Sequence, residues 1–444
     1  MRVREGIYTN NLAKACPKGL FLLDWVYIFL LKMSNKTVKK IDHCRICKGK
    51  KSFTFLSLRP MPKPNGFLTK PIKEERYPLD VSRCQTCGHV QLNHVISAEA
   101  LFSNYFYMSS MSQTMFWHFQ DSSKNLVKRF KLKSGSLVVD IGSNDGIFLS
   151  TFPKNIKTLG IDPAKNLKAI AEARGVETYV AFFSEKTAKT ALKKYGPADL
   201  TTGINVFAHI DDLDSVFAGV QTLLKKNGVL LMEFPYLVDL VAKNEFDTIY
   251  HEHLSYFLLK PLQTILSRHG LEIFDAERFD THGGTIRLYV QRKNDKPYAL
   301  TANVAKLRKL EDKIGMYKNE TYVKFAKNIQ AIPEGLIALV KKLKKENKRV
   351  IGYGASAKGN VLLNMCGFGP KDIDYIVDST PYKQGLYTPG THIPIFPEEH
   401  LEKDKPDYAI MFIWNFMDEV LKKQQGFLNR GGKFIVPVPK VRII

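Results

Sequence analysis

Four titratable side chains stand next to one another at Tyr250, His251, Glu252 and His253, within the stretch FDTIYHEHLSYF. A neutral histidine can take up a proton, because the pKa of its imidazole lies near working pH. Tyrosine hydroxyls can donate hydrogen bonds to an oxygen on which negative charge develops, and a carboxylate can hold an imidazole or a substrate hydroxyl. The segment therefore predicts general acid–base chemistry.

The same four residues also fit a structural role. If the segment is a β-strand, Tyr250 and Glu252 share one face, whereas His251 and His253 share the other. Two histidines on one face can form a hydrogen-bonded pair in a core or a pair of metal ligands. The elements around the segment must decide between these readings.

A strand and a glycine loop precede the segment, in GSLVVDIGSNDGIFLS (135–150). The strand ends at Asp140, and the loop residues that can approach a ligand are Gly142, Asn144, Asp145 and Gly146. The next strand ends at Asp162, where an acid can accept hydrogen bonds from both hydroxyls of a ribose. Acids in the loop would repel a phosphate but favour a sulfonium cation that carries an amino group. The pattern therefore predicts S-adenosylmethionine rather than a dinucleotide.

Two more strands follow at the expected spacing. One ends near Asn205 in ADLTTGINVFAHIDDL (198–213), and the other follows a turn at Asn227 and Gly228. Alternating helices and strands predict an α/β fold with a doubly wound, mostly parallel sheet. Ligands of such sheets bind at the carboxyl ends of the strands, where the loops gather.

A second strand–loop–helix unit lies near the C-terminus, in RVIGYGASAKGNVLLN (349–364). Its loop contains Gly354, Ala355 and Lys358, with no acid before the lysine, which is the pattern of an anion site. Further strands follow, and one of them ends at Asp378. We therefore expect a second, smaller α/β domain that binds a phosphorylated ligand.

Two Cys-x-x-Cys pairs lie near the N-terminus, at Cys44 and Cys47 and at Cys84 and Cys87. Two such pairs complete a tetrahedral site of four thiolates, which suits Zn²⁺. Because all four ligands are thiolates, we expect a structural zinc ion, with His43 and His89 as bystanders. Cysteines used in this way indicate a cytoplasmic protein without a disulfide framework.

The chain of 444 residues carries 66 lysines and arginines against 43 acidic residues, a net charge of +23. The charge is dispersed, and the densest run, 341–349, reads as a helix with a solvated face, so we expect no nucleic-acid partner. The apolar run 19–31 is short for a membrane span, so no stable membrane insertion is expected. We interpret residues 1–32 as an upstream extension. The oligomeric state stays open, with a monomer favoured.

Several strings together resemble the nucleotide-sugar C-methyltransferases, which methylate a ring carbon of 4-keto deoxysugars linked to a nucleoside diphosphate. The resemblance spans about residues 41–440 and rests on YFYMSSMSQTM, VVDIGSNDG, NVFAHIDDL, YHEHLSYF, THGGTIRLYV, GYGASAKGN and the paired cysteines. It implies an N-terminal extension (1–40), a zinc-binding domain (41–100), a class I methyltransferase domain (101–310) and a C-terminal Rossmann-like domain (311–444) that binds the nucleotide sugar.

The resemblance also implies roles for individual residues. His253 matches the catalytic base, and Glu252, Tyr250 and Tyr105 or Tyr107 match the same active site. Other matches are Phe182 and Phe183 beside the adenine, Asn205 on the substrate side, and His282, which either contacts the substrate or packs in its turn. Ala181 stands where relatives are expected to carry an acid, which leaves the adenine to backbone and stacking contacts.

The sequence therefore predicts an S-adenosylmethionine-dependent C-methyltransferase of a nucleotide-linked 4-keto sugar. An O- or N-methyltransferase of a sugar or small metabolite is the main alternative, and it would need no carbon acid. A nucleic-acid methyltransferase would need a continuous basic stripe, which the sequence lacks. An NAD-dependent oxidoreductase is disfavoured, because GYGASAKG departs from the usual glycine pattern.

Overall fold

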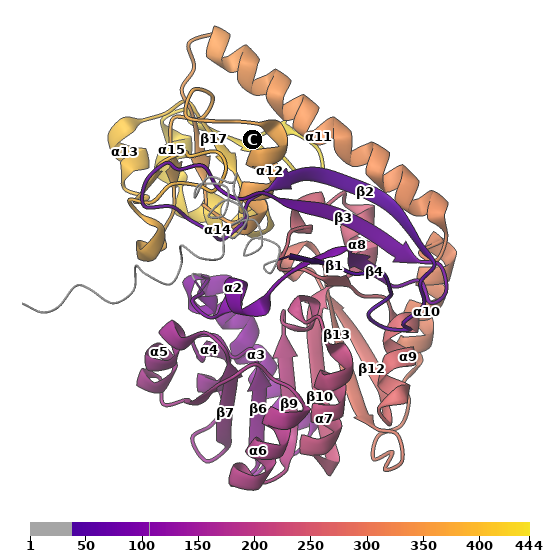
Figure 1. The fold of residues 1–444 in the computed structure, drawn as a ribbon. Coiled ribbons are helices and arrows are strands. Elements are labelled where there is room, and N and C mark those ends of the chain that lie inside the picture. Colours follow the sequence, from indigo (N-terminus) through magenta and orange to yellow (C-terminus); the bar gives the residue numbers. More distant parts are fainter. Residues whose placement is uncertain (1–37, 106) are drawn as a thin grey trace, which may run out of the picture.

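The computed structural model describes residues 38–105 and 107–444, and it leaves the side chain of His282 undescribed (Figure 1). The predictions for the extension, for the apolar run 19–31 and for the side chain of His282 therefore lie outside the described residues. No helix within 38–105 and 107–444 combines the length and apolar character that a membrane span requires.

The N-terminal part contains two small antiparallel sheets. Its elements are β1 (Val38–Lys40), β2 (Ser52–Met61), β3 (Tyr77–Cys84), β4 (Val90–Leu92), β5 (His94–Ile96) and α2 (Ala98–Phe102). Strand β1 pairs with β5, so the expected extension 1–40 overlaps this domain by one strand. The larger sheet has the order β11-β4-β3-β2, and its edge strand β11 (Ser255–Tyr256) comes from the segment just after His253.

The central part is the predicted doubly wound sheet, with the order β12-β13-β10-β9-β6-β7-β8. Its strands are β6 (Leu137–Ile141), β7 (Lys157–Asp162), β8 (Glu177–Val180), β9 (Ala198–Ile204), β10 (Leu224–Pro235), β12 (Leu271–Phe279) and β13 (Thr285–Arg292). Strand β13 runs antiparallel to both neighbours, and β6 to β10 are parallel. The expected turn at Asn227 and Gly228 lies inside β10, where the register shifts between Leu224 and Val229.

Helices cover both faces of this sheet (Figure 1). They are α3 (Gln113–Arg129), α4 (Ile147–Ser150), α5 (Lys168–Ala173), α6 (Glu185–Tyr195), α7 (Leu213–Leu223) and α9 (Leu259–Arg268). Helix α8 (Leu237–Ala242) follows the carboxyl end of β10. Short 3₁₀ turns follow the carboxyl ends of β7, β9 and β12: η2 (Lys165–Leu167), η3 (Phe207–His209) and η5 (Thr281–Gly283). Two others are η1 (Ser109–Met111), just before α3, and η4 (Phe246–Thr248), which precedes Tyr250.

The C-terminal part is the expected second α/β domain, with the strand order β16-β15-β14-β17-β18-β19. Its strands are β14 (Val350–Tyr353), β15 (Ile376–Val377), β16 (Ile395–Phe396), β17 (Tyr408–Met411), β18 (Lys433–Val436) and β19 (Arg442–Ile443). Its helices are α12 (Ala357–Cys366), η6 (Pro381–Lys383), α13 (His400–Asp404), η7 (Trp414–Phe416), α14 (Met417–Lys423) and α15 (Gln425–Asn429).

Two helices connect the central and C-terminal parts. Helix α10 (Ala302–Ile314) packs on β12, and the long α11 (Asn319–Lys345) runs along the outer edge beside β2 (Figure 1). The buried stripe of α11 includes Tyr322, Phe325, Ile329 and Leu336, and the basic run at its end is exposed, as predicted. The predicted fold class is therefore confirmed: a small N-terminal part precedes a central α/β part and a smaller C-terminal α/β part.

Candidate active site

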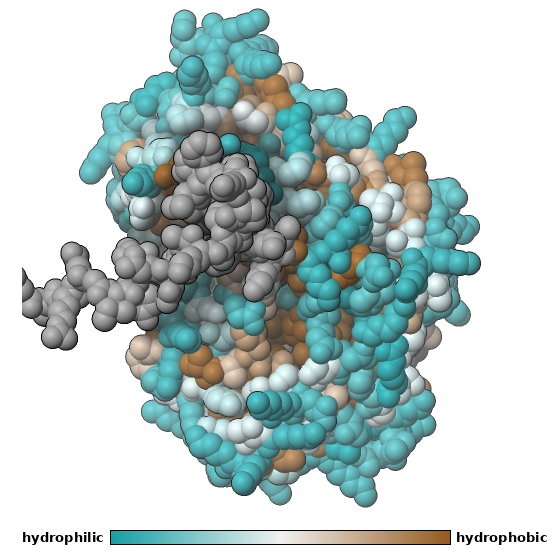
Figure 2. Space-filling view, in the orientation of Figure 1, coloured by the Kyte–Doolittle hydropathy of each residue, from teal (hydrophilic) through white to brown (hydrophobic). Residues whose placement is uncertain are grey.

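A cavity of about 600 Å³ lies where the central and C-terminal parts meet. The central sheet contributes residues from the carboxyl ends of its strands, among them Asp162, Asn205 and His209. The C-terminal part contributes the start of α12, and Asn65 comes from the loop between β2 and β3. Hydrophilic residues cover most of the face in Figure 2, and hydrophobic residues gather between the central part below and the C-terminal part above. All three parts of the chain thus contribute to one cavity.

The segment Tyr250–His253 forms a turn and not the strand that the alternation suggested. The His253 backbone N–H donates to the Tyr250 carbonyl at 2.9 Å, and β11 begins only at Ser255. The turn brings the rings of Tyr250 and His253 together, with centroids 4.0 Å apart, and both line the cavity. His251 points elsewhere: its Nε2 lies 3.1 Å from the Tyr77 carbonyl oxygen, and burial lowers its pKa to about 4. The two histidines therefore do not share a face.

The His253 ring is held in one tautomer. Its Nδ1 lies 2.7 Å from the Thr248 carbonyl oxygen, which can only accept, so Nδ1 carries the proton. In the neutral ring Nε2 then carries the lone pair, which is the state that a general base needs. The His209 ring packs beside it, with centroids 5.0 Å apart, and is stacked on Phe102.

Glu252 lies behind the cavity wall and is 1% exposed. Its two carboxylate oxygens accept hydrogen bonds from Asn65 Nδ2 at 2.8 Å and from the Tyr105 hydroxyl at 2.9 Å. Both partners line the cavity, so Glu252 orients them. Burial raises the pKa of Glu252 to about 7, although the two hydrogen bonds oppose the shift.

Glutamine at position 252 is expected to stabilise the protein at high pH. The carboxyl group titrates near about 4.3 when unfolded and near about 7 when folded. Between these values the folded state binds more protons, so its stability falls as the pH rises. Removing the carboxyl should raise the free energy of unfolding by about 3 kcal/mol above pH 7. Below about pH 4 the gain should vanish.

Chemical unfolding at about pH 4, 6 and 8 measures this difference. Glu320→Gln, on the exposed start of α11, is the matched control and should show no such pH-dependent gain. An equal gain for Glu252→Gln at all three pH values would contradict the argument.

Residues on the cofactor side of the cavity include six of the predicted set: Gly142, Asn144, Asp162, Phe182, Phe183 and Asn205. The two oxygens of Asp162 accept from the backbone N–H groups of Asn144 and Ala164, each at 2.8 Å, and retain lone pairs for hydroxyl groups. Asn205 Oδ1 is buried without a hydrogen-bond partner in the described part of the chain. An acid, two aromatic rings and an unsatisfied amide fit the ribose, adenine and amino-acid groups of S-adenosylmethionine.

Asp140, Asp145 and Gly146 are not among the described residues that line the cavity. Asp140 is buried and accepts a hydrogen bond from the Thr202 hydroxyl, and burial raises its pKa to about 7. Asp145 forms an ion pair with Arg174 at 2.9 Å. Both acids thus have partners within the protein that fix the loop, and their contact with the cofactor stays a prediction. Gly146 adopts φ 74° at the start of α4, where a Cβ would lie 3.0 Å from that of Ala171.

Tyr105 and Tyr107 both line the cavity, with ring centroids 6.3 Å apart. Asn144 holds their segment, since its side chain donates to the Tyr107 carbonyl and accepts from the Ser109 N–H. Burial and the neighbouring Glu252 hold the pKa of Tyr105 well above its usual range, so its hydroxyl stays protonated. The structure thus places both tyrosines on the cavity that His253 also lines and leaves the choice between them open.

The C-terminal glycine loop reaches the cavity through Ser356, Ala357 and Lys358, whereas Gly354 and Ala355 lie behind these lining residues. The Ala355 N–H donates to Asp378 Oδ2 at 2.7 Å, so this amide is occupied by a protein acid. The loop itself contains no acid before Lys358, as predicted, but the fold brings Asp378 next to it from the end of β15. Lys383 offsets the negative charge of Asp378, because its Nζ lies 3.6 Å from that carboxylate. Lys383 also lines the cavity.

Lys358 remains a cation at this end of the cavity. Its Nζ is buried, lies 4.7 Å from the Trp414 ring centroid and has no hydrogen-bond acceptor in the described part of the chain. His209 and Lys383 also line the cavity, and neither was predicted from the sequence. His209 could have been predicted from its place soon after a strand of the parallel sheet. The residues around Lys383 show no sequence pattern that predicts a place in the cavity.

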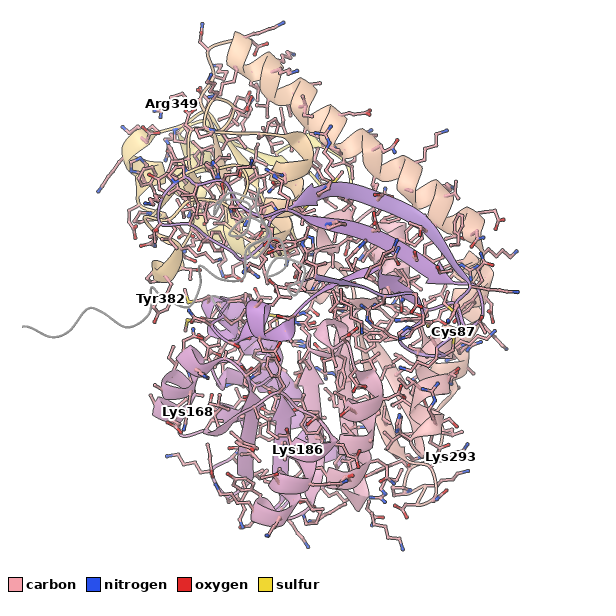
Figure 3. The ribbon with its side chains drawn as sticks, viewed as in Figure 1. Cys87, Lys168, Lys186, Lys293, Arg349 and Tyr382 are labelled. Carbon is pink, nitrogen blue, oxygen red and sulfur yellow. The ribbon has the colours of Figure 1, made fainter. Side chains whose placement is uncertain are left out.

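The four cysteines of the two pairs meet at one point. Their sulfur atoms all lie within 4.8 Å of one another, with 3.6 Å between Cys44 and Cys87 and 3.5 Å between Cys47 and Cys84. Zinc–sulfur bonds of about 2.3 Å in a tetrahedron give sulfur–sulfur distances of about 3.8 Å, so the cluster fits Zn²⁺. His89 is not a member, because its Nε2 lies 3.2 Å from the Ser255 hydroxyl. Cys87 lies at the outer edge of the N-terminal sheet (Figure 3).

Comparison with known proteins agrees with a chain of three successive parts. Three family models match in order: a zinc binding domain at 44–102, a methyltransferase domain at 116–276 and a C-methyltransferase C-terminal domain at 280–439. The C-methyltransferase NovU of Streptomyces niveus is 36% identical over 411 residues, which cover 92% of this chain and 98% of that protein.

Solved structures that resemble the chain include an S-adenosylmethionine-dependent methyltransferase from Clostridium acetobutylicum, 15% identical, which covers 40% of this chain and 91% of that one with a TM-score of 0.33. Magnesium protoporphyrin IX methyltransferase from Synechocystis, with bound SAH, is 15% identical and covers 40% of this chain and 82% of that one with a TM-score of 0.31. On the strength of the relative from Streptomyces niveus and the three matched domains, the chain belongs to the three-domain family of S-adenosylmethionine-dependent C-methyltransferases.

Proposed function

We propose that this C-methyltransferase acts on a ring carbon of a 4-keto deoxysugar linked to a nucleoside diphosphate. The observation that carries the proposal is the continuity of one cavity. Its wall runs from Asp162 and Phe183 on the cofactor side, past His253, to Lys358 and Lys383 in the C-terminal part. Such a cavity suits a substrate whose reacting ring lies at the centre and whose phosphates lie at the far end.

Carbon methylation requires a carbon nucleophile, and a keto group acidifies the C–H bonds next to it. His253 Nε2 takes that proton, the electron pair of the C–H bond passes into the enolate, and the ring becomes an imidazolium. The Thr248 carbonyl, 2.7 Å from Nδ1, stabilises the positive charge on the ring. When bound, S-adenosylmethionine supplies an electrophilic methyl group on its sulfonium. Asp162, Phe182 and Phe183, which line the cofactor side of the cavity, would hold the cofactor there.

The enolate oxygen needs hydrogen-bond donors that stay protonated. Burial and Glu252 hold the pKa of Tyr250 well above its usual range, so its hydroxyl remains a donor at neutral pH, whereas the one proton of the Tyr105 hydroxyl is donated to Glu252. Glu252 keeps Tyr105 in place through the hydrogen bond of 2.9 Å. Preorganised donors of this kind cost no reorganisation when the charge develops.

The diphosphate would bind near the start of α12, where Lys358 and Lys383 line the cavity. Lys358 has no acceptor of its own in the described part of the chain, and an anion would satisfy it. We also propose domain boundaries near residues 100 and 310, which separate the zinc-binding, methyltransferase and C-terminal parts. The C-terminal part would then be the domain that binds the nucleotide sugar.

The test is a transfer assay. Purified protein, methyl-labelled S-adenosylmethionine and a nucleotide-linked 4-keto deoxysugar should give a product whose label sits on a ring carbon. The matched 4-hydroxy sugar nucleotide should accept no label, because it has no acidic C–H bond. Label on oxygen or nitrogen, or equal transfer to the 4-hydroxy compound, would instead support the alternative O- or N-methyltransferase.

A further inference from the structure

Arg45 lies between the zinc-site cysteines Cys44 and Cys47, yet its side chain points away from them into the protein. The residue is 2% exposed, one of the largest fully buried side chains in the described residues. Its guanidinium Nε donates to Asp211 Oδ1 at 2.8 Å, and Nη1 donates to the carbonyls of Leu92 at 2.8 Å and Leu254 at 3.2 Å. The site geometry described above gives this residue no role.

Two of these three acceptors, Asp211 and Leu254, belong to the segments that carry His209 and His253, and the third, Leu92, belongs to β4. Leu254 directly follows His253, and Asp211 lies two residues after His209 and lines the cavity. The segments are joined to each other, since the Leu254 N–H donates to the Ala208 carbonyl at 2.7 Å. A guanidinium has its donors in a fixed planar fork, so one side chain can set the spacing of both segments.

We propose that Arg45 is a positioning residue through which the four-cysteine zinc site fixes the turn that carries His253. The proposal rests on the proposed role of His253 as the base. Arg45 sits inside the first Cys-x-x-Cys knuckle, and its backbone N–H donates to Gln91 Oε1 at 2.9 Å. The knuckle therefore holds the backbone of Arg45, and the side chain transmits that position to the carbonyl next to the base.

Arg83 provides a matched control within the same sheet. It precedes the zinc-site residue Cys84 as Arg45 follows Cys44, and it is also buried, with 7% exposed. Its Nε and Nη2 both donate to Asn319 Oδ1, at 3.0 and 2.7 Å, at the start of α11. Neither Arg83 nor Asn319 lines the cavity. Loss of a buried arginine should destabilise the two variants alike, but only Arg45 contacts the active-site segments.

The experiment compares Arg45→Met with Arg83→Met, and Arg45→Lys with Arg83→Lys, in the full chain. Zinc content is measured after thiol modification, methyl transfer gives kcat, and hydrogen–deuterium exchange follows the backbone of residues 248–258 and 204–212. For Arg45→Met we expect full zinc content, faster exchange in both segments and a kcat lower by about 100-fold, the effect of misplacing a catalytic group by about 1 Å. Arg83→Met should keep kcat within about threefold.

The lysine variants decide the case if Arg45→Met does not fold. Lysine keeps the charge but not the fork, so we expect Arg45→Lys to lose about 10-fold in kcat with zinc retained, and Arg83→Lys to lose little. Equal exchange and equal kcat for the Arg45 and Arg83 variants would overturn the proposal. Hydrogen–deuterium exchange tests the positioning role of Arg45 separately from the role of His253 as the base. Faster exchange at 248–258 without a loss of kcat would support the positioning role of Arg45 and contradict the assignment of His253 as the base.

Discussion

Glutamine in place of His253 is expected to lower kcat by about 10²–10⁴-fold, the usual contribution of a positioned general base. Glutamine fills much of the space of the ring but cannot take a proton at neutral pH. The affinity for S-adenosylmethionine should stay near that of the wild type, because the cofactor side of the cavity is built from other residues, such as Asp162 and Phe183. Steady-state kinetics and a binding titration measure the two effects separately.

His251→Gln is the matched control, because His251 is the neighbouring histidine and does not line the cavity. Its Nε2 lies against the Tyr77 carbonyl, and the amide of glutamine can replace that donor. We expect a loss of stability and a kcat within a few-fold of the wild type. A His251 variant as slow as the His253 variant would contradict the assignment of the base.

Proton exchange gives an independent measure of the same step. With a 4-keto substrate in D₂O, the wild type should introduce deuterium next to the ketone, and His253→Gln should not. If the His253 variant exchanges the proton at the wild-type rate, another group removes it, and the proposed mechanism fails even when methyl transfer is slow.

Several strands of the central sheet could be predicted from the sequence because they are apolar runs that end at a glycine loop or a polar residue. Strand β6 ends beside Asp140, β7 at Asp162 and β9 next to Asn205, all as expected. Paired cysteines likewise predicted their own cluster, since two knuckles suffice to define four sulfur positions. These signals are local, and each depends on a few neighbouring residues.

The turn at residues 250–253 could not be predicted, because its cause lies far away in the sequence. The segment alternates in polarity like a strand, but only Ser255 and Tyr256 pair with another strand, β4 of the N-terminal sheet. His251 is held by Tyr77, and Glu252 by Asn65, both from the N-terminal part. Tertiary contacts therefore overrule the alternation.

The partners of the loop acids could not be predicted for a related reason. Residue type and spacing place Asp145 in the cofactor loop, but they do not show that Arg174 pairs with it. In the C-terminal loop they do not show that Asp378 accepts from the Ala355 N–H. Side-chain direction depends on partners that only the folded chain brings together.

Removal of zinc is expected to have the largest effect on stability. Structural zinc contributes about 10–16 kcal/mol in small zinc-finger peptides at neutral pH, and here the four thiolates hold the ends of β3 and of the first knuckle. Chelation, or Cys84→Ser, should lower the free energy of unfolding by about 5 kcal/mol or more. Thermal unfolding with and without added Zn²⁺ measures the loss.

Cys366→Ser is the control, because Cys366 lies outside the four-cysteine cluster. It should keep full zinc content and change the free energy of unfolding by about 1 kcal/mol or less. Equal unfolding temperatures for the chelated and the zinc-loaded protein would contradict a structural metal.

Activity should disappear before the central sheet unfolds, because the N-terminal sheet includes β11, the strand that directly follows the turn of His253. The Leu92 N–H also donates to the Leu254 carbonyl at 3.0 Å, so the position of that turn depends on the order of β4. During gradual chelation, methyl transfer should therefore decline in step with zinc content, while the binding of S-adenosylmethionine persists. If transfer instead survived until the cofactor side melted, the zinc site would stabilise only its own domain.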